Sequence, residues 1–171
     1  EPHWHNSVEL FAVYEGSLTF IFREKQIRVD CGDFIIINTN ELHSVRADEE
    51  NMSVYVQIPI SEFKNYLTAD RFISFDKKGK GSLAKLDPMQ MKNTDHKMMQ
   101  LIRNIYDLSG TGEPGHEYEM LRDYYAMMQL LVTIYRQVEA DDMLYRSSKA
   151  LQRLSPITEY IKKHYAEDIS L

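Results

Sequence analysis

The turn signals in the first third of the chain constrain its fold more than any other feature. From residue 7 to residue 60, clusters of Gly, Pro, Asp, Asn or Glu recur every eight to ten residues. The segments between them are short and rich in Val, Ile, Phe and Tyr, and they cover residues 8–14, 18–22, 26–29, 34–37 and 53–58. This spacing is typical of an antiparallel sandwich or a small barrel. Gly16 and Gly32 stand where a tight turn can require a positive φ.

The second half of the chain has the periodicity of helices. Apolar residues between Met98 and Leu108 repeat at helical spacing, and the preceding Asn93-Thr94-Asp95 offers capping residues. A Gly-rich loop over 109–115 separates this helix from a longer one, predicted over 117–139. The longer helix is apolar around so much of its circumference that it needs burial on more than one side. We expect a second copy of the chain to supply part of that cover; burial inside one monomer is the alternative.

Two weaker patterns flank these helices. Residues 71–76 predict one more strand, and residues 76–82 predict an exposed polar loop. Ser155-Pro156 predicts the start of another helix, with Ser as the N-cap and Pro at the first helical position. Since Ser170 would cap a further helix and the sequence ends at Leu171, we expect it to stop within a second domain.

The polar residues most indicative of chemistry lie at the start of the chain. His3, His5 and Glu9 differ by even numbers, so one extended strand would point all three to the same face. His43 follows a turn further along. Three imidazoles and a carboxylate form a mixed N/O donor set suited to Zn, Ni, Fe, Mn or Cu. Phe11 shares the parity of Glu9, so we expect its ring to face the same cavity, where it stacks on a ligand or fills space.

The spacing of these residues resembles the two signature motifs of the cupin superfamily. The first motif is His-x-His, three residues, Glu, six residues, Gly; the second is Gly32, five residues, Asn38, Asn40 and His43. Asn38 and Asn40 stand where the second motif usually has Pro and Gly. The resemblance implies a small double-stranded β-barrel, or jelly roll. It also implies that His3, His5, Glu9 and His43 occupy the four metal-ligand positions of metal-binding cupins.

The order of the elements extends this resemblance over nearly the whole chain. A cupin barrel, an antiparallel α-helical hairpin and a final segment like the first helix of a helix-turn-helix domain together resemble an AraC/XylS-family transcription regulator. The resemblance implies an α+β chain with a β-barrel effector-binding domain over 1–76, a loop and dimerising hairpin over 77–147, and a linker with the first helix of a truncated DNA-binding domain over 148–171. It implies a homodimer that senses a small-molecule effector, such as a sugar, and contacts DNA only through the missing C-terminal domain.

Composition agrees with a sensor rather than a DNA-binding or membrane protein. The formal net charge is −6, which argues against a basic face that grips nucleic acid. No apolar run approaches the roughly 18 residues of a membrane span. The single cysteine, Cys31, excludes an intramolecular disulfide and fits the cytoplasm.

Three interpretations of the histidine group remain open. The four residues hold a metal, or they hydrogen-bond a polar effector without metal, or they satisfy one another inside the barrel. We expect no catalysis; the alternative function is a metal-dependent cupin enzyme of the isomerase or oxygenase type that uses His3, His5, Glu9 and His43.

Overall fold

The fold is taken from a computed structural model of the chain. The structure describes residues 1–23, 25–64, 73–77, 86–110 and 114–137, together with residues 154, 156, 157, 160, 161, 163 and 164. The strands are β1 (Ser7–Glu15), β2 (Ser17–Phe22), β3 (Gln26–Asp30), β4 (Asp33–Ile37), β5 (His43–Arg46) and β6 (Met52–Pro59). The helices are α1 (Ile60–Lys64), α2 (Pro88–Ser109) and α3 (His116–Leu130), and α3 continues into the π-helix η1 (Leu131–Tyr135).

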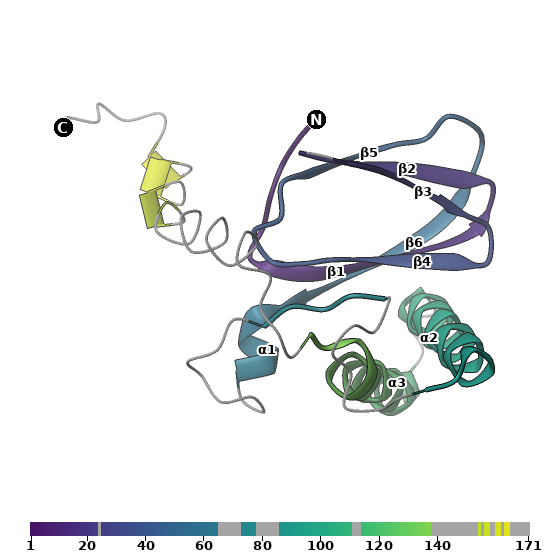
Figure 1. Cartoon of the computed structure of the whole chain (residues 1–171). Coiled ribbons are helices and arrows are strands. Elements are labelled where there is room, and N and C mark those ends of the chain that lie inside the picture. Colours follow the sequence, from purple (N-terminus) through teal and green to yellow (C-terminus); the bar gives the residue numbers. More distant parts are fainter. Residues whose placement is uncertain are drawn as a thin grey trace.

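The strands form two antiparallel sheets, with the orders β4-β1-β6 and β3-β2-β5. Figure 1 shows the two sheets as facing layers, with α2 and α3 against the outer side of the sheet that contains β1. Within the described residues the strands make two separate sheets and no closed barrel, so the predicted barrel is wrong in this respect. The predicted all-β first part with antiparallel pairing is confirmed.

Strand β1 is the centre of the molecule because both of its faces are buried. Leu10 and Ala12 point to the helical side and pack in one core with residues such as Met98 of α2. Val13 points to the other side and packs with Phe20 between the two sheets. The alternation of a strand therefore gives β1 one face toward the helices and one toward the intersheet space.

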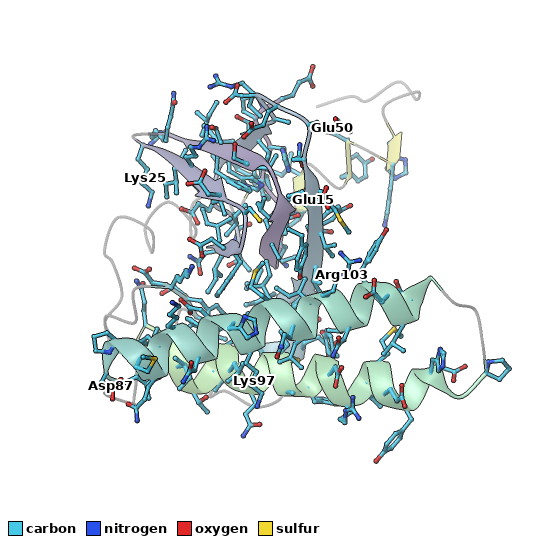
Figure 2. The ribbon with its side chains drawn as sticks, turned by 90° about the vertical axis from the view of Figure 1, so that its right-hand side faces the viewer. Glu15, Lys25, Glu50, Asp87, Lys97 and Arg103 are labelled. Atoms are coloured by element: carbon cyan, nitrogen blue, oxygen red, sulfur yellow. The ribbon has the colours of Figure 1, made fainter. Side chains whose placement is uncertain are left out.

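The helices lie side by side along the sheet, as Figure 2 shows. Helix α2 begins earlier than predicted, since its N-cap is Asp87 and not Asn93, Thr94 or Asp95. Asp87 accepts a hydrogen bond from the backbone of Gln90, and the Gln90 side chain accepts one from the backbone of Asp87. This reciprocal capping box, followed by proline at the first helical position, is a strong start signal.

The second long helix ends earlier than predicted. The helical chain reaches Tyr135, and Arg136 is extended, with φ −65° and ψ 128°. The reason is tertiary, because Arg136 forms an antiparallel bridge with Phe75. That bridge is all that the described residues show of the strand predicted over 71–76. Residues 71, 72, 78–82, 138 and 139, on which parts of these predictions rest, lie outside the described residues.

Two glycines take the conformation predicted from their turns. Gly16 has a φ of +65° and Gly32 a φ of +82°. The missed element is β5, a four-residue strand with an irregular burial pattern. Among the described helices, none combines the length and apolar character that crossing a bilayer requires. Pro156 and Ile157 are helical, in agreement with the predicted C-terminal helix, whereas Ser155 lies outside the described residues.

Candidate metal and ligand site

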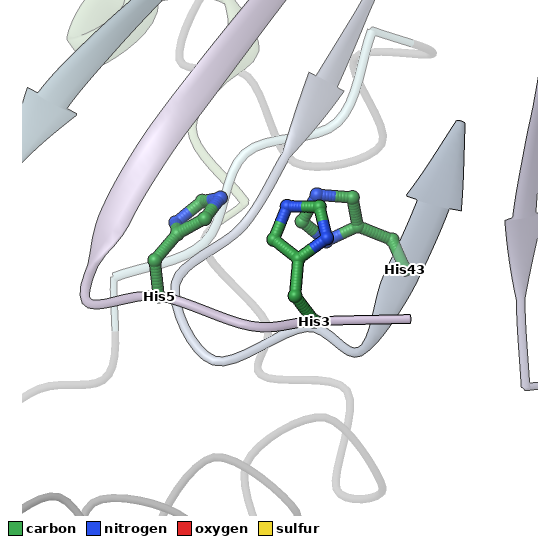
Figure 3. A group of neighbouring side chains, drawn as sticks. All are labelled: His3, His5 and His43. Carbon is green, nitrogen blue, oxygen red and sulfur yellow. The ribbon is translucent and has the colours of Figure 1, made fainter. Parts of the chain in front are cut away.

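The structure brings His3, His5, Glu9 and His43 together at one end of the intersheet space. Glu9 lies on β1 and points inward, and His5 lies just before that strand. His3 and His43 face each other in an antiparallel bridge, with N–H···O distances of 2.9 and 3.0 Å in the two directions. This bridge ties the first residues of the chain to the start of β5. Figure 3 shows the three imidazoles turned toward one another.

The three histidines form a compact group of nitrogen donors. The ring centroids are 4.4 Å apart for His3 and His43, and 5.2 Å apart for His5 and His43. One ring nitrogen of each residue lies within 4.8 Å of the others. In a tetrahedral zinc site the nitrogens would be about 3.3 Å apart, so a modest contraction is sufficient for coordination.

Backbone carbonyls hold one nitrogen of every ring. Nδ1 of His3 contacts the carbonyl of Glu1 at 3.1 Å, that of His5 the carbonyl of Ser7 at 3.1 Å, and that of His43 the carbonyl of Glu41 at 2.8 Å. A carbonyl only accepts, so each Nδ1 carries the hydrogen and each neutral ring leaves a lone pair on Nε2. The same arrangement orients histidines that bind metals.

The carboxylate of Glu9 faces two of these Nε2 atoms. Its Oε2 is 3.0 Å from Nε2 of His5 and 3.4 Å from Nε2 of His43. These three atoms are buried and make no aligned hydrogen bond. Two lone pairs beside a carboxylate oxygen repel it unless a positive species, a proton or a metal ion, lies among them. These two nitrogens and one oxygen converge on one point and can each donate a lone pair to a metal ion. This set of ligand atoms fits a divalent transition metal.

Protonation behaviour follows from the same contacts. Burial of Glu9 opposes its ionisation, but His43, His5 and the amide of Gln57 outweigh this and hold the pKa of the carboxyl well below its ordinary range. Burial also opposes the charging of His43, yet the neighbouring Glu9 carboxylate raises the pKa of that imidazole above its ordinary value. Without a metal, Glu9 is therefore ionised and the neighbouring His43 takes up a proton more readily than an ordinary histidine.

Phe11 faces the intersheet space, as its parity predicts, but it belongs to an aromatic group. Its ring stacks on Tyr55, with centroids 5.2 Å apart and planes 20° apart. It meets the ring of Phe20 edge-on, also at 5.2 Å. Tyr55 is 60% exposed, so this group reaches solvent on the β6 side. Phe11 is two residues after Glu9 on β1, so this aromatic group lies next to Glu9 on the same inner face of the sheet.

Two residues of the site, Gln57 and Asn40, were not predicted as such. Gln57 donates a hydrogen bond to Oε1 of Glu9 from the adjacent strand β6. Asn40 donates a backbone hydrogen bond of 2.8 Å to the carbonyl of His5, and it has a φ of +57°. This left-handed conformation explains why the cupin pattern usually has Gly there, and Asn tolerates it better than most residues. In the sequence, the only signal for Asn40 was that it stands where the second cupin motif usually has Gly.

Comparisons with known proteins identify the family of the chain. A family model described as the AraC-like ligand binding domain matches residues 1–131. Among solved structures, a cupin-2 domain containing protein from Shewanella frigidimarina matches with 30% sequence identity and a TM-score of 0.32. That match covers 34% of this chain and 58% of the other protein, so it spans little more than half of that protein's length. None of the curated proteins matches the chain.

Proposed function

The chain belongs to the family of AraC-like ligand-binding domains, and we propose that it is the effector-sensing part of a transcription regulator of the AraC/XylS type. The observation that carries this proposal is the convergence of the Nε2 atoms of His5 and His43 and of Oε2 of Glu9. These three atoms are buried without aligned hydrogen bonds. Buried polar atoms of this kind require a partner, and in a ligand-binding domain the natural partner is a ligand.

We propose that a divalent transition metal, such as Zn, Ni, Fe, Mn or Cu, belongs to this site. His3, His5 and His43 would hold it through their Nε2 atoms, with Glu9 as the anionic ligand. The metal would supply an electrophilic centre that attracts an oxygen atom of the effector. The chain's own residues do the orienting, because each Nδ1 is fixed by a carbonyl and Glu9 by Gln57.

The effector class that suits this site is a small polar molecule with several oxygen atoms, of which a sugar is one example. The exposed Tyr55 and the half-buried Phe11 offer an aromatic surface on the same inner face. The metal-free alternative uses the same residues as hydrogen-bond donors and acceptors for the effector. The two alternatives differ in whether the protein binds a metal ion in the absence of the effector.

Calorimetric titration of the chain with Zn²⁺ and with Co²⁺ distinguishes them. We expect one site per chain, and we expect it to disappear in His43→Ala. The matched control is His96→Ala, which removes an exposed histidine from α2 and should bind like the wild type. Absence of metal binding in the wild type would contradict the metal proposal, and a screen of polar small molecules by thermal shift would then test the metal-free site.

We further propose that the regulator is a homodimer and that DNA is contacted by a helix-turn-helix domain of the full-length protein. Support for the dimer comes from the apolar residues Tyr118, Leu121 and Tyr125, which are exposed on α3. They are spaced by three and four residues and so share one face of the helix. Turnover of any substrate by the metal-loaded protein would overturn the sensor function in favour of a cupin enzyme.

A further inference from the structure

The loop between β4 and β5, residues 38–42, is hydrogen-bonded to two of the site histidines. The backbone N–H of Asn40 donates to the carbonyl of His5 at 2.8 Å, and Nδ1 of His43 donates to the carbonyl of Glu41 at 2.8 Å. Oε2 of Glu41 accepts a hydrogen bond of 3.0 Å from the backbone of Asn38, which closes the loop on itself. A movement of either imidazole toward a bound ion therefore acts on residues 38–41.

Asn38 connects this loop to a distant part of the chain. Its side-chain amide donates to the carbonyl of Phe75 at 3.0 Å, and its Oδ1 accepts from the backbone N–H of Phe75 at 2.7 Å. Asn38 is 6% exposed and Phe75 is 2% exposed. The side chain thus replaces a neighbouring strand for a segment 37 residues away in the sequence. Both hydrogen bonds are buried, so breaking them would leave polar groups without water to replace the lost partner. The contact between Asn38 and Phe75 is therefore costly to break.

The segment around Phe75 pairs on its other side with the end of the helical region. The backbone N–H of Asp76 donates to the carbonyl of Tyr135 at 2.8 Å, and that of Gln137 donates to the carbonyl of Ser74 at 2.9 Å. The Gln137 side chain also bonds Ser74 and Asp76, at 3.0 and 3.2 Å. Gln137 lies two residues after the end of the helical region at Tyr135.

The helix end at this point is of an unusual type. Residues Leu131–Tyr135 form a π-helix, a rare form that often marks functional positions. Tyr135 is fully buried, donates from its hydroxyl to Asp95 of α2 at 2.7 Å, and meets the ring of Phe34 edge-on. A wider helical turn that is held by tertiary contacts can change its hydrogen bonding when those contacts shift.

We propose that Asn38 is a positioning residue that couples occupancy of the histidine site to the conformation of residues 135–137, where the chain leaves the helices. This inference rests on the proposed function of the site. An ion that draws the three imidazoles together pulls on Glu41 through His43, and Asn38 transmits the displacement to Phe75. The Phe75 segment then shifts its hydrogen bonds to Tyr135 and Gln137. Effector occupancy would in this way reach the link to the output domain.

Adjacency alone does not demonstrate coupling, so the test compares amide hydrogen exchange by NMR with and without Zn²⁺. In the wild type, Zn²⁺ should slow exchange at Asn40 and His43 and also, by about fivefold or more, at Asp76 and Gln137. In Asn38→Ala, zinc should still protect Asn40 and His43 but no longer Asp76 and Gln137. The matched control, Asn104→Ala, removes a different side-chain hydrogen bond, to Asp123, and should respond like the wild type.

Two outcomes overturn the proposal: no zinc-dependent protection at Asp76 and Gln137 in the zinc-bound wild type, or undiminished protection there in Asn38→Ala. Should Asn38→Ala fail to fold, Asn38→Asp keeps the acceptor for Phe75, loses the donor, and should show a reduced zinc response. Calorimetry on the same samples shows whether zinc binds.

If it does not bind, the metal proposal fails and the coupling is tested without metal. His43→Ala should then speed exchange at Asp76 and Gln137, whereas His96→Ala should not. Equal exchange in the two histidine variants would overturn the coupling.

Discussion

Gln57 of β6 donates a hydrogen bond from its side-chain amide to Oε1 of Glu9 on the neighbouring strand β1. The two residues are directly opposite each other in the antiparallel register. Because the amide occupies one carboxylate oxygen, the other oxygen, Oε2, is left to face His5 and His43. The hydrogen bond thus fixes the orientation of the only carboxylate among the four predicted ligand residues.

This relationship predicts that Gln57 tunes the affinity of the site. In Gln57→Leu the carboxylate of Glu9 loses the hydrogen bond to Oε1 and can rotate. Removing a hydrogen-bond partner of a metal ligand in this way weakens metal binding. We expect the dissociation constant for Zn²⁺ to rise about tenfold or more, as measured by calorimetry. Gln100→Leu, an exposed glutamine of α2, is the control and should bind normally. Unchanged affinity in Gln57→Leu would show that the hydrogen bond does not position Glu9.

A second prediction separates two glycines that have similar φ angles. A Cβ at Gly16 would lie 2.3 Å from the carbonyl oxygen of Glu50, whereas a Cβ at Gly32 would meet nothing within 4 Å. Gly32→Ala should therefore cost only the strain of a left-handed alanine, about 1–2 kcal/mol of unfolding free energy. Gly16→Ala adds a clash with backbone and should cost clearly more. Urea denaturation measures both, and equal losses would argue that the turn at Gly16 adjusts freely.

The inward side chains of β1 were predictable because they depend on parity alone. Glu9 and Phe11 differ by two, whereas Val8 and Leu10, at the positions of opposite parity, pack in the core beside the helices. His3 and His5 lie before β1, so the parity of one continuous strand does not account for their place in the site. The pairing of strands was not predictable from the sequence. Gln57 became a neighbour of Glu9 only through the β1–β6 register, and a shift by one residue would have turned Gln57 toward the helices.

The helix boundaries illustrate the difference between local and tertiary signals. The start of α2 at Asp87 has a local cause, the capping box with Gln90, and the sequence contained it. The extended conformation of Arg136 has a tertiary cause, its bridge to Phe75, and helical periodicity continues past it. A sequence pattern therefore reveals the first kind of boundary and not the second.

The exposed apolar face of α3 predicts the oligomeric state. Leu121 is 52% exposed and lies between Tyr118 and Tyr125 on the same face of the helix. If this face joins two copies, Leu121→Glu places a charge in the interface and should weaken the dimer at least about tenfold. Sedimentation velocity over a range of concentrations measures the change. Lys97→Glu changes the charge of an exposed residue of α2 and serves as the control; a wild-type protein that is monomeric at all concentrations would refute the prediction.

The last prediction concerns acid sensitivity between α2 and α3. Asp123 is 4% exposed and accepts hydrogen bonds from Nε of Arg122 at 2.8 Å and from the amide of Asn104 at 3.1 Å. Because Arg122 and Asn104 stabilise the charged form, the pKa of Asp123 lies below its ordinary value in the folded protein. A pKa lowered by folding stabilises the protein fully above the unfolded-state value, about 3.9, and this stabilisation is lost as the pH falls through the folded-state value.

Asp123→Asn should therefore lower the unfolding free energy by about 1–3 kcal/mol at pH 7. The difference from the wild type should shrink below about pH 4, where the wild-type carboxylate begins to be protonated on unfolding. Urea denaturation at pH 7 and at pH 3 measures both effects. Asp107→Asn, which removes an exposed ion pair with Arg103 within α2, should cost no more than about 0.5 kcal/mol at pH 7. A deficit in Asp123→Asn that stays constant across this pH range would mean that neutral hydrogen bonding, and not the charge of Asp123, joins the two helices.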